Sequence, residues 1–246
     1  MKQTLHVTII ILISIFSIGC TNIPNASEIL QSNSATTISR DYQEITKLLV
    51  KYKKILDLRN PKLSDKKLSY EILFDIQNQK DSVRLLKSNS YKDYLKKAFD
   101  ENTKYKSDFL VLGIYKMIYK IYNIKDGHHI TALGYNADDF TKAYYTLKVL
   151  RWKIRNAKDA KGRFIFATWQ LNWQLELNKN YNNITIKNTE ELPSLKNRSE
   201  TLLNHSNFNF EITMSRMIDK ISNSLKSMGE EPANLSISAM KAIILL

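Results

Sequence analysis

The feature that most constrains the fold is a run of fourteen residues, Phe109–Tyr122, in which nearly every side chain is apolar. A helix of this length spans about 21 Å, well short of the roughly 30 Å hydrocarbon core of a bilayer. Its charged residues, Lys116 and Lys120, lie one turn apart and therefore share one face. We expect this run to be the central buried helix of the domain, with Gly127 as a stop shortly after its end.

Three more helical patterns precede this run. In the first, apolar residues recur every three or four positions through Tyr42–Leu56, and Pro61 closes the helix. The second covers roughly Leu68–Leu86. The third begins at Ser90, which an acid follows three residues later as in a capping box, and it continues toward Asp108.

Helical signals return after the central run. Asn136 is the predicted N-cap of a helix that reaches about Ala157, and Asp159–Gly162 is the predicted turn behind it. Residues 212–227 again show helical spacing. The apolar C-terminus, residues 242–246, is expected to dock on the core.

One segment gives conflicting signals. Between Trp169 and Leu177 apolar and polar residues alternate strictly, which favours a half-buried strand, yet Gln, Leu and Glu are good helix formers. Residues 168–177 are therefore left open between helix and strand, with Ile184–Ile186 and the alternating Phe208–Met214 as potential further strands. Ten Gly plus Pro residues among 246 argue against a turn-rich β fold. The predicted class is mainly α, with room for a small antiparallel β element around residues 163–187.

The N-terminus carries the most specific signal. Lys2 gives a basic start, Val7–Ile18 is almost unbroken Val, Ile, Leu and Phe, and Gly19 and Cys20 follow directly. A basic start followed by a short apolar run is typical of an export signal. The run is too short to span a bilayer. Cys20 is the chain's only cysteine, which rules out an intramolecular disulfide.

This order of charge, apolar run, small residue and cysteine resembles the lipobox signal peptide of bacterial lipoproteins; the resemblance covers residues 1–20 only. It implies that residues 1–19 are removed and that Cys20 is joined through sulfur to diacylglycerol, with a further acyl chain such as palmitate on its amino group. Because Thr21 is not Asp, the resemblance also implies the outer membrane facing the periplasm if the cell is Gram-negative. A simple secretory signal or an uncut anchor is the alternative.

The sequence after Cys20 divides into two parts. Residues 20–38 are the lipidated cysteine and a predicted flexible tether, rich in Ser, Thr and Asn, with an end-to-end distance of about 25 Å. Residues 39–246 are the predicted single, mainly helical envelope domain. No internal repeat is evident, and the mature domain resembles no recognised family.

The net charge of +13 lies entirely within residues 39–163, which hold 28 basic and 15 acidic side chains. On a helix, four of the basic residues around Trp152 would share a face, which could attract phospholipid or lipopolysaccharide headgroups or an envelope protein. The alternative is an ordinary solvated lysine-rich face. Nucleic acid is not an expected partner, because no nucleic-acid motif accompanies the charge. The four are Lys148, Arg151, Arg155 and Lys158.

Support for catalysis is weak. His128 and His129 are adjacent, so they do not share a helix face, and neither belongs to a known metal-ligand motif. There is no G-x-S-x-G or phosphate-binding glycine loop, and we expect no metal or cofactor. Trp169 and Trp173 could stack on sugar rings or simply fill the core.

These observations lead to one functional expectation and one alternative. The expectation is a lipid-anchored envelope lipoprotein, a non-enzymatic binding or scaffold component with a basic face, held to the membrane by acyl chains on Cys20. The alternative is a binder or enzyme directed to a glycan such as peptidoglycan, using Trp169, Trp173 and the loop of His128 and His129.

Overall fold

A computed structural model describes residues 26–88, 90–168 and 208–244. In these ranges the chain forms helices joined by loops and short 3-10 turns, with no strand and one isolated bridge between Lys158 and Phe164. The mainly α prediction is confirmed. The helices are α2 (Ala26–Arg59), α3 (Lys66–Gln77), α4 (Tyr91–Ala98), α5 (Lys106–Ile121), α6 (Ala137–Asn156), α9 (Phe208–Ser227) and α10 (Ile237–Ile244), and the 3-10 turns are η1 (Pro61–Leu63), η2 (Ile124–Asp126) and η3 (Ala132–Gly134).

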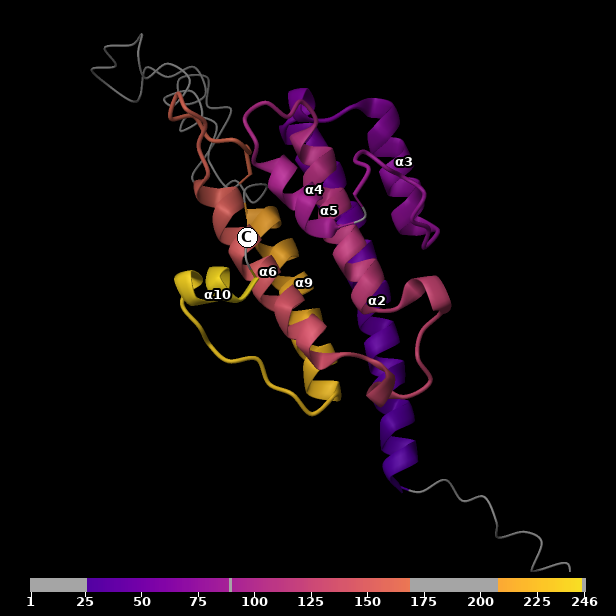
Figure 1. The fold of residues 1–246 in the computed structure, drawn as a ribbon. Helices are drawn as coiled ribbons and strands as arrows, with labels where there is room; N and C mark the ends of the chain where they lie inside the picture. The colour runs from indigo at the N-terminus through magenta and orange to yellow at the C-terminus, as the bar shows by residue number, and fades with distance from the viewer. Residues whose placement is uncertain (1–25, 89, 169–207, 245–246) are drawn as a thin grey trace, which may run out of the picture.

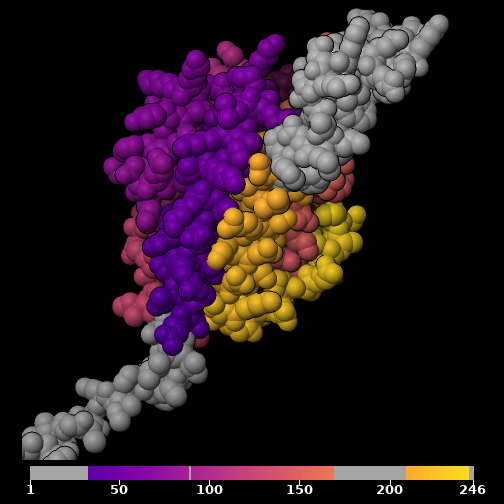
Figure 2. Space-filling view, turned by 180° about the vertical axis from the view of Figure 1, so that it is seen from behind, coloured from indigo at the N-terminus to yellow at the C-terminus, as the bar shows by residue number. Residues whose placement is uncertain are grey.

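Four of these helices surround a common apolar core. Helix α9 packs between α2 and α6, and α5 contacts both α2 and α6 from the other side (Figure 1). Figure 2 shows α2 and α9 side by side along one face of the molecule. Helix α3 packs on α2 and α5, α4 packs on α5, and α10 lies on α6.

Helix α5 is the central helix that the sequence predicts, since thirteen of its sixteen residues are buried. The close approach of α4 depends on Gly113. A Cβ added there would stand 2.7 Å from Cδ2 of Leu95, closer than two carbon atoms can pack. Helices α4 and α5 therefore pack closely against each other at Gly113.

Helix α2 begins earlier than the sequence suggests. It includes residues 26–38, which the sequence analysis assigned to a flexible tether, and Ala35 and Ile38 are buried in it. The physical reason is that these two side chains continue the apolar stripe of Tyr42 and Ile45 backwards at a spacing of three and four. Only residues 21–25 separate Cys20 from this helix.

Three other predicted elements differ from the structure. The second helix ends at Gln77 instead of Leu86, because Gln79 takes a left-handed conformation and the chain turns. Ser90 precedes α4 but its hydroxyl forms no capping hydrogen bond, and a separate helix, α5, begins at Lys106. The alternating segment from Phe208 lies in helix α9.

The segment around α6 follows the prediction closely. The Asn136 side chain accepts a hydrogen bond from the Asp139 amide, 3.2 Å away, and the helix ends at Asn156. The turn after it is closed by the amide of Gly162, which donates to the carbonyl of Asp159. Both the cap and the turn are confirmed.

The C-terminal docking takes a different form from the one expected. Met240 of α10 is buried against Tyr145 and Val149 of α6, whereas Ile243 remains 44% exposed. In the part of the chain that the structure describes, no helix combines the length and the apolar character needed to cross a membrane. Of the segment predicted to allow a β element, residues 163–168 contain only the isolated bridge, and the remainder lies outside the described residues.

Candidate functional site

A groove with a volume of about 920 Å³ runs along α4, the second half of α5 and the start of α6. It is open to solvent and carries an excess of positive charge. Six basic and three acidic side chains line it: Arg84, Lys92, Lys116, Lys120, Lys125 and Lys142 against Asp81, Asp126 and Asp139.

One carboxylate organises the inner end of this groove. Asp81 forms ion pairs with Lys116, which is almost fully buried, and with Arg84, whose Nη1 lies 2.8 Å away. Burial raises the pKa of Asp81, but the hydrogen bonds and charges of Lys116 and Arg84 outweigh it and hold the pKa below its usual value. Burial lowers the pKa of Lys116, and Asp81 opposes that fall. The two cations are thus fixed in place by a carboxylate that stays ionised.

The outer part of the groove is where excess charge is available. Lys120, Lys125 and Lys142 are exposed, and within the described ranges none of them forms an ion pair. Asp126 and Asp139 balance only part of this charge. A concave surface with a net positive charge concentrates anions near it.

Two tyrosines add hydrogen-bonding groups to the groove. Tyr91 and Tyr119 line it and are partly buried. Burial raises the pKa of both phenols, so each keeps its hydroxyl proton at neutral pH and can donate it to an anionic oxygen. The groove therefore offers ammonium and hydroxyl donors, a combination suited to phosphate or carboxylate groups.

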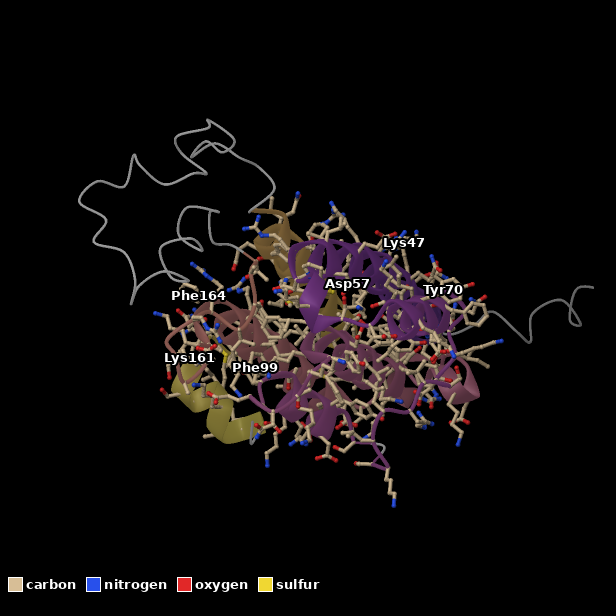
Figure 3. The ribbon with its side chains drawn as sticks, turned by 90° about the horizontal axis from the view of Figure 1, so that it is seen from above. Lys47, Asp57, Tyr70, Phe99, Lys161 and Phe164 are labelled. Atoms are coloured by element: carbon tan, nitrogen blue, oxygen red, sulfur yellow. The ribbon has the colours of Figure 1, made fainter. Side chains whose placement is uncertain are left out.

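Another hollow, of about 670 Å³, lies near the opposite end of α6. Lys161 and Phe164, labelled in Figure 3, line it together with Arg59. Of its five basic side chains, Arg163 lies 2.7 Å from Asp159 and Lys106 donates to a backbone carbonyl. The groove at α5 is larger and is lined by six basic side chains, so it is the better candidate for binding an anion.

The basic residues that the sequence places on one face of α6 do not form one open surface. Arg151 donates to the Ser215 hydroxyl at 2.9 Å, and Arg155 forms an ion pair with Glu211 at 3.4 Å, so both arginines contact α9. Lys148 lies over the ring of Tyr144 on its own helix. These contacts join helices, and a binding role for the set stays a prediction.

Lys158 and Trp152, which belong to the same prediction, each have a contact of their own. Lys158 stands over the ring of Phe164, with 4.9 Å between its Nζ and the ring centre. Trp152 is 40% exposed, and Lys241 of α10 covers its ring at 3.9 Å. Trp169, Trp173 and Cys20 lie outside the described residues.

The two adjacent histidines have structural contacts. The His128 Nδ1 is 3.2 Å from the hydroxyl of Tyr135, and its ring packs edge-on against Tyr42. Burial and the neighbouring His129 lower the pKa of His128. Among the described residues, no three His, Cys, Asp or Glu side chains gather closely enough to hold a metal ion.

A cluster of fully buried charges lies elsewhere, around Lys53. Its Nζ is 2.7 Å from a carboxylate oxygen of Asp108, 2.6 Å from both oxygens of Asp57 and 2.7 Å from the Ser69 hydroxyl. Asp108 also accepts from the Asp65 amide. The side chains of Lys53 and Asp108 are fully enclosed, so this cluster joins α2, α3 and α5 and is closed to a ligand.

Sequence reasoning found part of the groove and missed the rest. Lys116 and Lys120 stood out as the charged positions of an apolar helix, and both line the groove. Arg84, Lys92 and Lys142 come from three other segments, and no linear pattern connects them. No family model, curated protein or solved structure matches the chain.

Proposed function

We propose that this chain is a lipid-anchored lipoprotein of the cell envelope, a non-enzymatic binding component that presents a basic groove to an anionic partner. The observation that carries the proposal is the position of Cys20, the only cysteine, directly after the apolar segment of an export signal. Two or three acyl chains would hold the protein stably at a bilayer, whereas one chain binds only marginally.

The short connection to the body supports this arrangement. Six Cα-to-Cα steps separate Cys20 from Ala26, where α2 begins, and they span at most about 20 Å. The helical body would then lie within reach of the headgroups. In a bacterium with two membranes, the residue after the cysteine favours the outer membrane, with the body in the periplasm.

The groove supports the binding part of the proposal. Its exposed lysines, Lys120, Lys125 and Lys142, lie near the hydroxyls of Tyr91 and Tyr119 along one hollow. The ligands suited to such donors carry phosphate or carboxylate groups, as lipopolysaccharide, anionic lipids and acidic envelope proteins do.

The binding claim can be tested with deacylated lipopolysaccharide, which keeps the sugar phosphates but cannot insert into a bilayer. The lipidated protein is reconstituted in phosphatidylcholine nanodiscs, and the affinity is measured at low and high salt. We expect Lys120→Glu with Lys142→Glu to weaken binding, and salt to weaken it as well.

The matched control is Lys54→Glu with Lys67→Glu, two exposed lysines outside the groove. This pair changes the net charge by the same amount, so it separates the groove from a general charge effect. Equal affinities for the two double variants would contradict a role for the groove.

A further inference from the structure

The loop between α5 and α6 exposes two large aliphatic side chains. Ile130 is 87% exposed and Leu133 is 78% exposed, whereas Ala132 between them is buried. Figure 1 shows this loop beside the N-terminal half of α2. Ile130 shares a hollow with Arg40 of α2, and Leu133 shares another with Ser34.

The loop is held firmly in this shape. The buried Tyr135 hydroxyl accepts a hydrogen bond from the His129 amide at 3.2 Å, and its ring packs edge-on against the His129 ring. Gly134 lies so close that an added Cβ would stand 2.6 Å from His129 Cγ. Because backbone and ring contacts fix the loop, Ile130 and Leu133 are presented to the outside by the fold itself.

The length of chain between the anchor and α2 brings the bilayer within reach of these side chains. Ala35, which borders the same hollow as Ile130, is about 14 Å along the helix from Ala26. The six steps from Cys20 to Ala26 reach about 20 Å, which exceeds that distance. A body tethered at Cys20 can therefore lay this loop on the bilayer that holds the acyl chains.

The charge beside Ile130 suits an anionic leaflet. Arg40 is exposed and lines the hollow that Ile130 borders. Basic residues beside apolar ones favour the interface of a membrane with anionic headgroups. Glu230 lies on the other side, by Leu133, so the favourable charge is concentrated at Ile130.

We propose that Ile130 and Leu133 form a second, non-covalent membrane contact that orients the body on the lipid surface. The contact rests on the proposed anchoring at Cys20. The occupant is the lipid bilayer to which that cysteine is attached, and the side chains reach the boundary between headgroups and acyl chains.

The test uses the fact that acylation consumes the only native thiol. Ile130→Cys, Leu133→Cys and Leu58→Cys are each made in the full-length chain, so that each processed lipoprotein carries one free thiol for an environment-sensitive fluorophore. Leu58 is the matched control, because it is 83% exposed but lies at the opposite end of α2 from the anchor. Each protein is reconstituted into vesicles of phosphatidylglycerol and phosphatidylcholine with nitroxide-labelled lipids.

We expect lipid nitroxides to quench the labels at positions 130 and 133, with loss of most of their fluorescence, and to leave the label at position 58 unchanged. Equal and weak quenching at all three positions would overturn the proposal. So would labels at 130 and 133 that are shielded from water yet not quenched by lipid, because that result indicates a protein partner.

Flotation of the same vesicles separates this proposal from the one on which it rests. Protein that floats with the vesicles without quenching at 130 and 133 keeps the anchor and refutes the contact. Protein that does not float, with an unmodified Cys20 by mass spectrometry, refutes both. Circular dichroism of the three exposed-site variants checks that each remains folded.

Discussion

Lys53 is the side chain whose removal should destabilise the fold most. It is fully buried and its ammonium group contacts two carboxylates and a hydroxyl, from α2, α3 and α5. In Lys53→Met, the Asp108 carboxylate remains enclosed without its cation. Removing one partner of a buried ion pair costs about 3–5 kcal/mol, so the unfolding equilibrium should shift by roughly two to four orders of magnitude.

Removing Asp57 should destabilise the fold less than removing Lys53. Asp57 is 21% exposed and water can reach it, so Asp57→Ala should cost about 1 kcal/mol and leave Lys53 paired with Asp108. Burial raises the pKa of Asp108, and Lys53 with the hydrogen bonds from Asp65 and Ser69 opposes that rise. The double variant Lys53→Met with Asp108→Leu removes both enclosed charges and should recover most of the loss.

Urea unfolding followed by far-ultraviolet circular dichroism measures these free energies. We expect Lys53→Met to lose several times more stability than Asp57→Ala, and the double variant to be more stable than Lys53→Met alone. A loss below about 1 kcal/mol for Lys53→Met would refute it, because the cluster would then not need its cation.

Three further predictions concern packing, capping and pH. Gly113→Ala should cost about 1–3 kcal/mol, since its Cβ would meet the Leu95 side chain at 2.7 Å, and a lower unfolding midpoint would show it. Asn136→Ala should cost about 1 kcal/mol through loss of the cap on α6, whereas Asn136→Asp should cost little. The pKa of His128 is lowered in the folded protein, so the unfolded chain binds the proton more readily. The stability that neutral His128 contributes should therefore be lost as the pH falls from the pKa of His128 in the unfolded chain toward its lower pKa in the folded protein. A His128→Asn variant should show a weaker dependence of the urea midpoint on pH between these two pKa values.

Sequence reasoning succeeded where one local signal dominated. The apolar run in α5 has apolar side chains on nearly all sides of the helix, so it was predicted to be buried. That prediction is confirmed. The start of α6 was equally well marked, because the side chain of Asn136 caps the helix that follows it. Both features depend on residues close together in the chain.

Predictions from composition or a short pattern were less accurate. The Ser, Thr and Asn content of residues 26–38 suggested a tether. Ala35 and Ile38 nevertheless continue the apolar face of α2 and are buried. Segment 208–214 alternates as a strand would, yet Phe210 and Met214 are buried one helical turn apart in α9.

The polar features that depend on distant residues could not be predicted. Lys53 and Asp108 are 55 positions apart, and nothing in the sequence near either one indicates that they pair. The groove likewise assembles charges from separate segments around Lys116 and Lys120. Arg151 and Arg155 were correctly placed on one helix. Their partners, Ser215 and Glu211, belong to α9, which is far from α6 in the sequence.

Mass spectrometry of the N-terminal peptide of protein extracted from membranes tests the central claim most directly. We expect a chain that begins at Cys20 and carries a diacylglycerol group on its sulfur. An intact Met1 start, a cut at another position or a free thiol at Cys20 would contradict it.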